Sequence, residues 1–220
     1  LHIMALIVFG PQWFFGIDSI FECISVVVVF LVAWFSHKAY KLTKEDRYQT
    51  MSRAFGLIGG GILAKIITNI FIYSSIKTTM PVQQIDILYD IGYLLSRYLY
   101  VLGLLLLLVM IVLKIKDRRN ITLFALMSLL LIWISYYSYY VFHSLAAVLI
   151  LFIVQHFYNN CQTSKKTTSK CVFMSFLCLL LAHLTFMAVE FWRPAYVLAE
   201  GLQLFGFLSL AANYIMIMRR

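Results

Sequence analysis

Long runs of apolar residues, separated by short polar stretches, alternate along the whole chain. A hydrocarbon layer about 30 Å thick needs roughly 20 apolar residues of helix. Seven runs are of that order: residues 17–35, 54–76, 87–115, 121–137, 139–158, 171–191 and 195–218. They are too long for barrel strands, and helices satisfy their backbone hydrogen bonds internally. The pattern therefore predicts an all-α, polytopic bundle of seven transmembrane helices in a single domain.

Two places in this pattern need interpretation. The stretch SYYSYY at residues 135–140 leaves little room between the fourth and fifth runs. One helix through both would be far longer than the bilayer is thick, so we expect two helices and a tight turn. Near the N-terminus, LHIMALIVF is too short to span and is ended by Gly10-Pro11. We expect residues 1–16 to form an interfacial segment.

Composition supports lipid as the main solvent. Of the 220 residues, 63% are hydrophobic and 12% are charged, whereas soluble domains carry about 25% charged residues. The four cysteines show neither CxxC pairs nor a metal-binding spacing, so no disulfide framework is implied.

The positions of the basic residues predict the orientation. Lysine and arginine gather at cytoplasmic helix ends. Most of them lie in the first, third and fifth connections and the C-terminal tail, for example Lys38, Lys116, Lys170 and Arg220. The N-terminus is then outside and the C-terminus inside. The net charge of +9 reflects this topology beside anionic lipid and not nucleic-acid binding. We expect a multi-pass protein of a prokaryotic plasma membrane.

A weak internal similarity suggests a repeat. A shift of 118 positions lays residues 55–66 on 173–184 and puts Lys65 opposite His183. A shift of 103 positions puts Gly103 opposite Gly206. The first three helices would then recur as the last three in the same orientation, with the fourth as a connector, as internal repeats do in many transporters.

Polar residues recur every three or four positions in several runs, which places them on single helix faces. A charge at the bilayer centre costs about 2.5–3.5 kcal/mol, so these faces should point into the bundle. We expect an outward-opening polar cavity with a ligand-binding or ion-path site formed by Glu22, Lys65, Asn69, Arg97, His183, Glu200 and Gln203. Counting turns puts Glu22 and Glu200 near the outer face and Lys65 and His183 near the middle.

Two structural readings stay open beside this one. Arg97 with Glu200 or Glu22 could form a buried ion pair that only fixes helix packing. Lys65 has no carboxylate at its own counted depth, so it is either neutral or reaches towards Glu22. The glycine run at residues 59–61 favours close helix contact.

No cofactor, metal site or catalytic residue is predicted. The histidines His143, His156 and His183 fall at different counted depths, so no pair is placed to ligate haem or a metal. Nucleotide-binding, protease and kinase motifs are absent from the sequence. The sequence therefore gives no sign of enzymatic activity.

The stretch AWFSHKAYKLTKEDRYQTMSRAFGLI, in which one span leads through a basic linker into the next, resembles small uncharacterised prokaryotic seven-span proteins and the seven-helix sensor modules found ahead of histidine kinases. The topology is also similar to the transporter, opsin and receptor grouping. Opsins attach retinal to a lysine of the last span, and residues 195–218 contain none.

The resemblance implies a sensory or receptor-like module that binds a ligand in the outward cavity and signals to a cytoplasmic partner through its basic inner loops. A carrier of a small solute, proton or ion is the alternative, and a structural membrane subunit is a third. Pro11, Pro81 and Pro194 lie outside the span centres, whereas carriers often break helices at their sites. This favours the sensor.

Overall fold

The computed structural model describes residues 11–14, 16–77, 82–113, 118–135, 139–164 and 167–218. All regular structure in these residues is helical. The elements are η1 (Gln12–Phe14), α2 (Ile17–Thr43), α3 (Asp46–Lys77), α4 (Val82–Leu108), the π-helical turn η2 (Val109–Leu113), α5 (Arg118–Ser135), α6 (Tyr139–Ser164), α7 (Thr167–Met187) and α8 (Ala195–Met218). Residues 1–10, most of the expected interfacial segment, lie outside the described residues.

Six of the described helices are long and apolar enough to cross a membrane, namely α2, α3, α4, α6, α7 and α8. The chain is therefore a multi-pass integral membrane protein. The helix α5, with 18 residues, is not among the six. The expected break near residues 135–140 is confirmed as two helices, because α5 ends at Ser135 and α6 begins at Tyr139.

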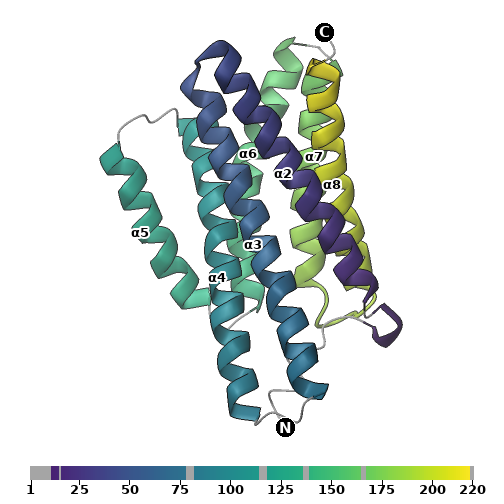
Figure 1. Cartoon of the computed structure of the whole chain (residues 1–220). Coiled ribbons are helices and arrows are strands. Elements are labelled where there is room, and N and C mark those ends of the chain that lie inside the picture. The colour runs from purple at the N-terminus through teal and green to yellow at the C-terminus, as the bar shows by residue number, and fades with distance from the viewer. Residues whose placement is uncertain are drawn as a thin grey trace.

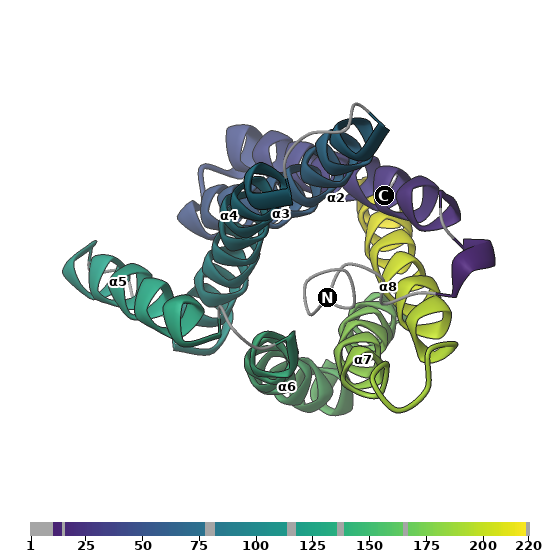
Figure 2. The same ribbon diagram turned by 90° about the horizontal axis from the view of Figure 1, so that it is seen from below.

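The six apolar helices stand in a closed ring, which Figure 2 shows end-on. Its order is α2, α3, α4, α6, α7 and α8, and α8 packs against α2 to close it. The helix α5 lies outside the ring beside α4 (Figure 1). Large apolar side chains such as Trp34, Leu130 and Phe205 are exposed on the outside. In a membrane these side chains contact lipid, which is as apolar as they are.

Helix ends follow local sequence chemistry. The helix α2 ends at Lys44, which has a positive φ of 59° and donates its backbone N–H to the Tyr40 carbonyl over 2.8 Å. The helix α7 ends at Met187, whereas the apolar run continues to Phe191. Turns follow, with Trp192 N–H bonded to the Ala188 carbonyl at 3.0 Å. Pro194, which disfavours helical conformation in the residue before it, precedes α8.

The helices α3 and α4 form a hairpin that projects past the ends of their neighbours at the lower end of Figure 1. They pack closely through glycines. A Cβ added to Gly61 would lie 2.7 Å from the Ser96 carbonyl oxygen, and one added to Gly103 would lie 2.7 Å from the Ala54 carbonyl oxygen. The expected role of the 59–61 glycine run in close helix contact is therefore confirmed.

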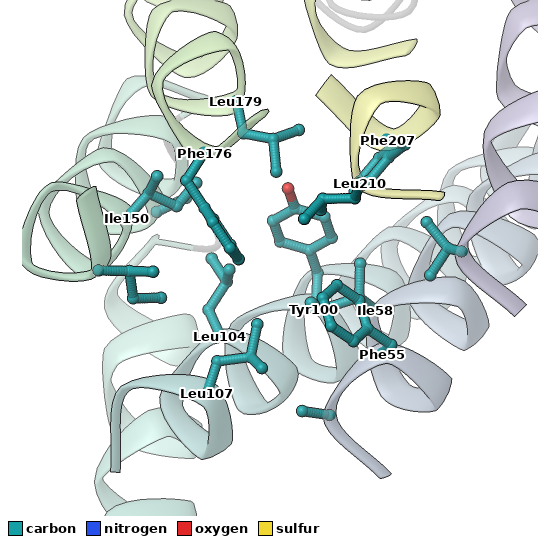
Figure 3. Close-up of a cluster of buried hydrophobic side chains, with 14 of the residues drawn as sticks. Phe55, Ile58, Tyr100, Leu104, Leu107, Ile150, Phe176, Leu179, Phe207 and Leu210 are labelled. Carbon is teal, nitrogen blue, oxygen red and sulfur yellow. The ribbon is translucent and has the colours of Figure 1, made fainter. Parts of the chain in front are cut away.

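One half of the ring interior is filled by apolar side chains, and Figure 3 shows its centre. We call the following residues the apolar layer: Ile58 of α3, Leu104 of α4, Ile150 of α6, Phe176 of α7, and Phe207 and Leu210 of α8. All six are at most 2% exposed. The layer lies in the half of the bundle where α2 turns into α3.

Candidate functional site

Lys65 of α3 lies between two carboxylates from two other helices. Its Nζ is 2.5 Å from Oε1 of Glu22 on α2 and 3.4 Å from Oε1 of Glu200 on α8. Both carboxylate side chains are 1% exposed, whereas the Lys65 side chain keeps 26% exposure. Of the two alternatives for Lys65, the structure therefore has it reaching Glu22. We call Glu22, Lys65 and Glu200 the charge cluster.

The α3–α4 overhang explains why the sequence placed these three residues at different depths. Glu22 and Glu200 each lie five positions into helices that begin at Ile17 and Ala195. Lys65 lies 12 positions before the end of α3 at Lys77. Because α3 extends beyond α2 and α8 at this end (Figure 1), the extra turns bring Lys65 level with the carboxylates. Counting residues from helix ends assumes flush ends, which this bundle does not have.

A second polar group connects α4, α7 and α6. The Tyr100 hydroxyl lies 2.9 Å from Nε2 of His183, and Nδ1 of His183 lies 2.9 Å from Nδ1 of His143. All three side chains are buried. We call them the histidine–tyrosine chain. A bond between two Nδ1 atoms needs one protonated nitrogen and one lone pair, so at most one of the two rings carries two protons.

The expectation that no two histidines share a depth is therefore wrong. His143 lies four residues after the start of α6, and His183 lies four residues before the end of α7. The early end of α7 at Met187 brings His183 closer to this end of the bundle than the apolar run indicated. His143 was missed for that reason. Tyr100 had a visible signal, because it continues the polar spacing of Tyr93 and Arg97 on α4.

The remaining expected site residues lie around these two groups. Asn69 accepts a 2.8 Å hydrogen bond at Oδ1 from the Tyr93 hydroxyl. The Arg97 guanidinium lies over the Phe142 ring, 5.4 Å from its centroid. Gln203 is half-buried on α8, one turn from Glu200. The partner that the structure gives to both Glu22 and Glu200 is Lys65, whereas the sequence suggested Arg97.

The charge cluster and the histidine–tyrosine chain are electrostatic neighbours. The Lys65 ammonium acts on both His143 and His183, and the Glu200 carboxylate acts on Tyr100. The expected site residues Lys65, Glu22, Glu200 and His183 thus gather in one region of the ring interior. These four residues come from four helices, and Tyr100 of α4 and His143 of α6 bring the number of helices to six.

Aromatic side chains cover this region from the end where α2 and α8 begin. Phe14 of η1 is 2% exposed and packs edge-on against Phe21 and Tyr196, with ring centroids 5.7 and 6.1 Å apart. Phe186 stacks on His143 at 4.7 Å. Trp13 is 67% exposed. Of the two aromatic residues next to each other in η1, only Phe14 therefore inserts among the helices.

The chemistry available here is ionic and proton-based. Within the described residues, no group of three or more histidine, cysteine or acidic side chains is arranged to hold a metal ion. The four cysteines are free thiols. The outward-opening cavity stays a prediction. Neither the protein-family models nor the curated proteins nor the solved structures compared with this chain match it.

Proposed function

We propose that this protein is a sensory or receptor-like membrane module that accepts its ligand at the charge cluster. The observation that supports this most is that, among the described residues, the buried charged side chains lie in one half of the ring. Each ring helix that carries a cluster or chain residue places apolar side chains between that residue and the opposite end, as Ile58 does for Lys65 and Phe207 for Glu200. A ligand entering from the charged half meets a dry barrier.

In this arrangement the chain crosses the membrane seven times, with α5 as the fourth span. The helices α4 and α6 run in the same direction in Figure 1. The helix α5, which connects them in the sequence, runs in the opposite direction. Its outward side chains, including Leu126, Leu130 and Trp133, are apolar and more than half exposed. Such a helix beside α4 is suited to lipid contact and returns the chain to the start of α6.

The orientation in the proposal has the basic end in the cytoplasm. The exposed residues Lys38, Lys41, Lys44 and Arg47 lie where α2 meets α3, and Lys170 lies near the start of α7. Both connections are at the upper end of Figure 1. Basic residues at one end favour the cytoplasmic side and offer a surface to an acidic partner or to anionic lipid. The charge cluster is then nearer the outside, and the signal passes to a cytoplasmic partner.

A parallel repeat of α2–α4 and α6–α8 is also supported. In the ring order of Figure 2, a half-turn would exchange the two triplets. Lys65 of the second helix contacts Glu22 of the first helix in its own triplet and Glu200 of the third helix in the other. His183 likewise contacts His143 of the first helix in its own triplet and Tyr100 of the third helix in the other. The two polar groups therefore occupy corresponding places.

A carrier of a small solute, proton or ion is the second candidate, because three ionisable side chains from three helices meet in the membrane interior. Two features favour the sensor instead. The apolar layer separates the cluster from the basic end, and α2, α3, α7 and α8 run as unbroken helices past the cluster. The helix irregularity η2 lies beyond Leu104, on the other side of the layer. A structural membrane subunit, the third candidate, would need the ion pairs of Lys65 only to fix the packing of the helices.

Reconstituted protein separates these candidates. A fluorescent label on Lys38→Cys would report changes at the basic end while the pH is varied and while a panel of small cations, zwitterions and neutral solutes is added. The sensor predicts a label response that Glu200→Gln abolishes and that Glu190→Gln, at an exposed carboxyl, retains. It also predicts no net flux into proteoliposomes. Flux that depends on Glu200 would establish a carrier, and a silent label with no flux would leave a structural role.

A further inference from the structure

The charge cluster contains one more negative group than it has partners for. The single ammonium of Lys65 is shared between Glu22 and Glu200. Apart from the Lys65 ammonium at Oε1, neither carboxylate oxygen of Glu22 has a partner within the described part of the chain, although both are buried. A buried carboxylate without hydration or hydrogen bonds is strongly disfavoured unless it is neutralised. One ammonium neutralises one carboxylate, so the pair of Glu22 and Glu200 calls for one additional positive charge.

The other titratable groups around the carboxylates do not supply this charge. Asp18 of α2 adds a further negative charge near Glu200. Tyr93 and Tyr100 of α4, Tyr139 of α6 and Tyr196 of α8 face one or both carboxylates with neutral hydroxyls.

Two further basic groups contact aromatic side chains of this region. His183 of α7 is linked to Tyr100 by a hydrogen bond between its Nε2 and the Tyr100 hydroxyl. Arg97 of α4 acts on Tyr139 and His143, and its guanidinium lies over Phe142. Among the described residues, the ion pairs of Glu22 and Glu200 are those with Lys65.

We propose that the ligand of this module is a proton, which binds to the Glu22–Glu200 carboxyl pair beside Lys65. A proton needs a single carboxylate oxygen, and the hydrogen it adds can be donated to the other carboxylate or to a tyrosine oxygen. A sodium or potassium ion needs several oxygen ligands and would have to sit beside the ammonium, which repels it. The Lys65 side chain keeps 26% exposure, so the cluster is not enclosed on every side.

This inference rests on the proposed function, because it identifies the ligand of the same site. Infrared difference spectroscopy of the protein in lipid nanodiscs, between alkaline and acidic pH, tests it directly. The wild type should gain the C=O stretching band of a protonated carboxyl group, with a downshift in deuterium oxide. Glu22→Gln and Glu200→Gln should each lose that band, because the remaining carboxylate then forms a neutral pair with Lys65. Glu190→Gln is the matched control and should keep it.

The outcomes distinguish the site from the function. Absence of the band in the wild type, its retention in both glutamine variants, or its removal by sodium or potassium at constant pH would overturn the proton site. Glu200→Asp keeps the negative charge and should retain the band. Its retention would show that the loss of the band in Glu200→Gln is not caused by misfolding. A band without any response of the Lys38→Cys label would leave the proton site standing and remove the sensory role. A label response to another solute, without the band, would leave the sensory role standing and remove the proton site.

Discussion

A lysine in a hydrocarbon layer keeps its charge only where other groups replace the water it has lost. Glu22 and Glu200 do this for Lys65, and each comes from a different helix. Such contacts hold the two carboxylates, which would otherwise repel each other, in one place. The stability of the bundle therefore depends on the sign of the charge removed, and two substitutions test this in opposite directions.

Lys65→Met should destabilise the protein, because two buried carboxylates then face each other without a cation. Breaking a buried ion pair by removing one partner costs about 3–5 kcal/mol. The measurement is thermal unfolding in detergent, followed by circular dichroism at neutral pH. The double variant Lys65→Met with Glu200→Gln should recover part of the loss. Unfolding of Lys65→Met at the wild-type temperature would mean that Lys65 carries no structural charge.

Glu200→Gln should have the opposite effect at alkaline pH. It removes the excess negative charge and leaves Glu22 and Lys65 as a balanced pair, so we expect a gain of about 1–3 kcal/mol. The wild type should lose stability as the pH rises, because its folded state holds a proton that the unfolded chain has released. This pH dependence should be weaker in the variant. A matched loss of stability at every pH would instead indicate that the Glu200–Lys65 contact stabilises the fold by itself.

At the scale of the elements, the apolar runs were sufficient to predict each helix and the separation of α5 from α6. They were not sufficient to predict depth. The overhang of α3 and α4 and the early end of α7 at Met187 decide which side chains are level. The overhang depends on how helices slide against one another, which a single sequence does not express, and the end of α7 falls inside an apolar run. For this reason Lys65 was expected on the right face but at a different depth from Glu22 and Glu200, and His143 was not expected in the site.

Glycine contacts are part of what fixes that sliding. A Cβ on Gly103 would lie 2.6 Å from Cγ1 of Ile58 and 2.7 Å from the Ala54 carbonyl oxygen. Gly103→Ala should therefore push α4 away from α3 and cost about 1–3 kcal/mol. Gly56→Ala is the matched control, because nothing lies within 4 Å of the added Cβ. It should be neutral or stabilise by up to about 1 kcal/mol through helix propensity. Thermal unfolding of both variants in detergent gives the comparison, and equal effects would contradict the close α3–α4 contact.

At the scale of the whole molecule, the proposed function depends on whether α5, which lies outside the ring, crosses the membrane. If α5 crosses the membrane, the two triplets of the ring have the same orientation, and both halves of the site face the same solution. If α5 does not cross, α6–α8 would be inverted relative to α2–α4. The common direction of α4 and α6 in Figure 1 favours the first arrangement.

Single-cysteine accessibility in intact cells or sealed vesicles decides between these arrangements. The four native cysteines, Cys23, Cys161, Cys171 and Cys178, form no disulfide and can be replaced first. Lys38→Cys near the α2–α3 turn and Lys170→Cys near the start of α7 should then react from the same, cytoplasmic side. Arg193→Cys, in the turn before α8, should react from the other side. Labelling of Lys38→Cys and Lys170→Cys from opposite sides would show that α5 does not cross. The buried charges would then have come together from two halves of opposite orientation, and a parallel repeat could not account for the matching contacts of Lys65 and His183.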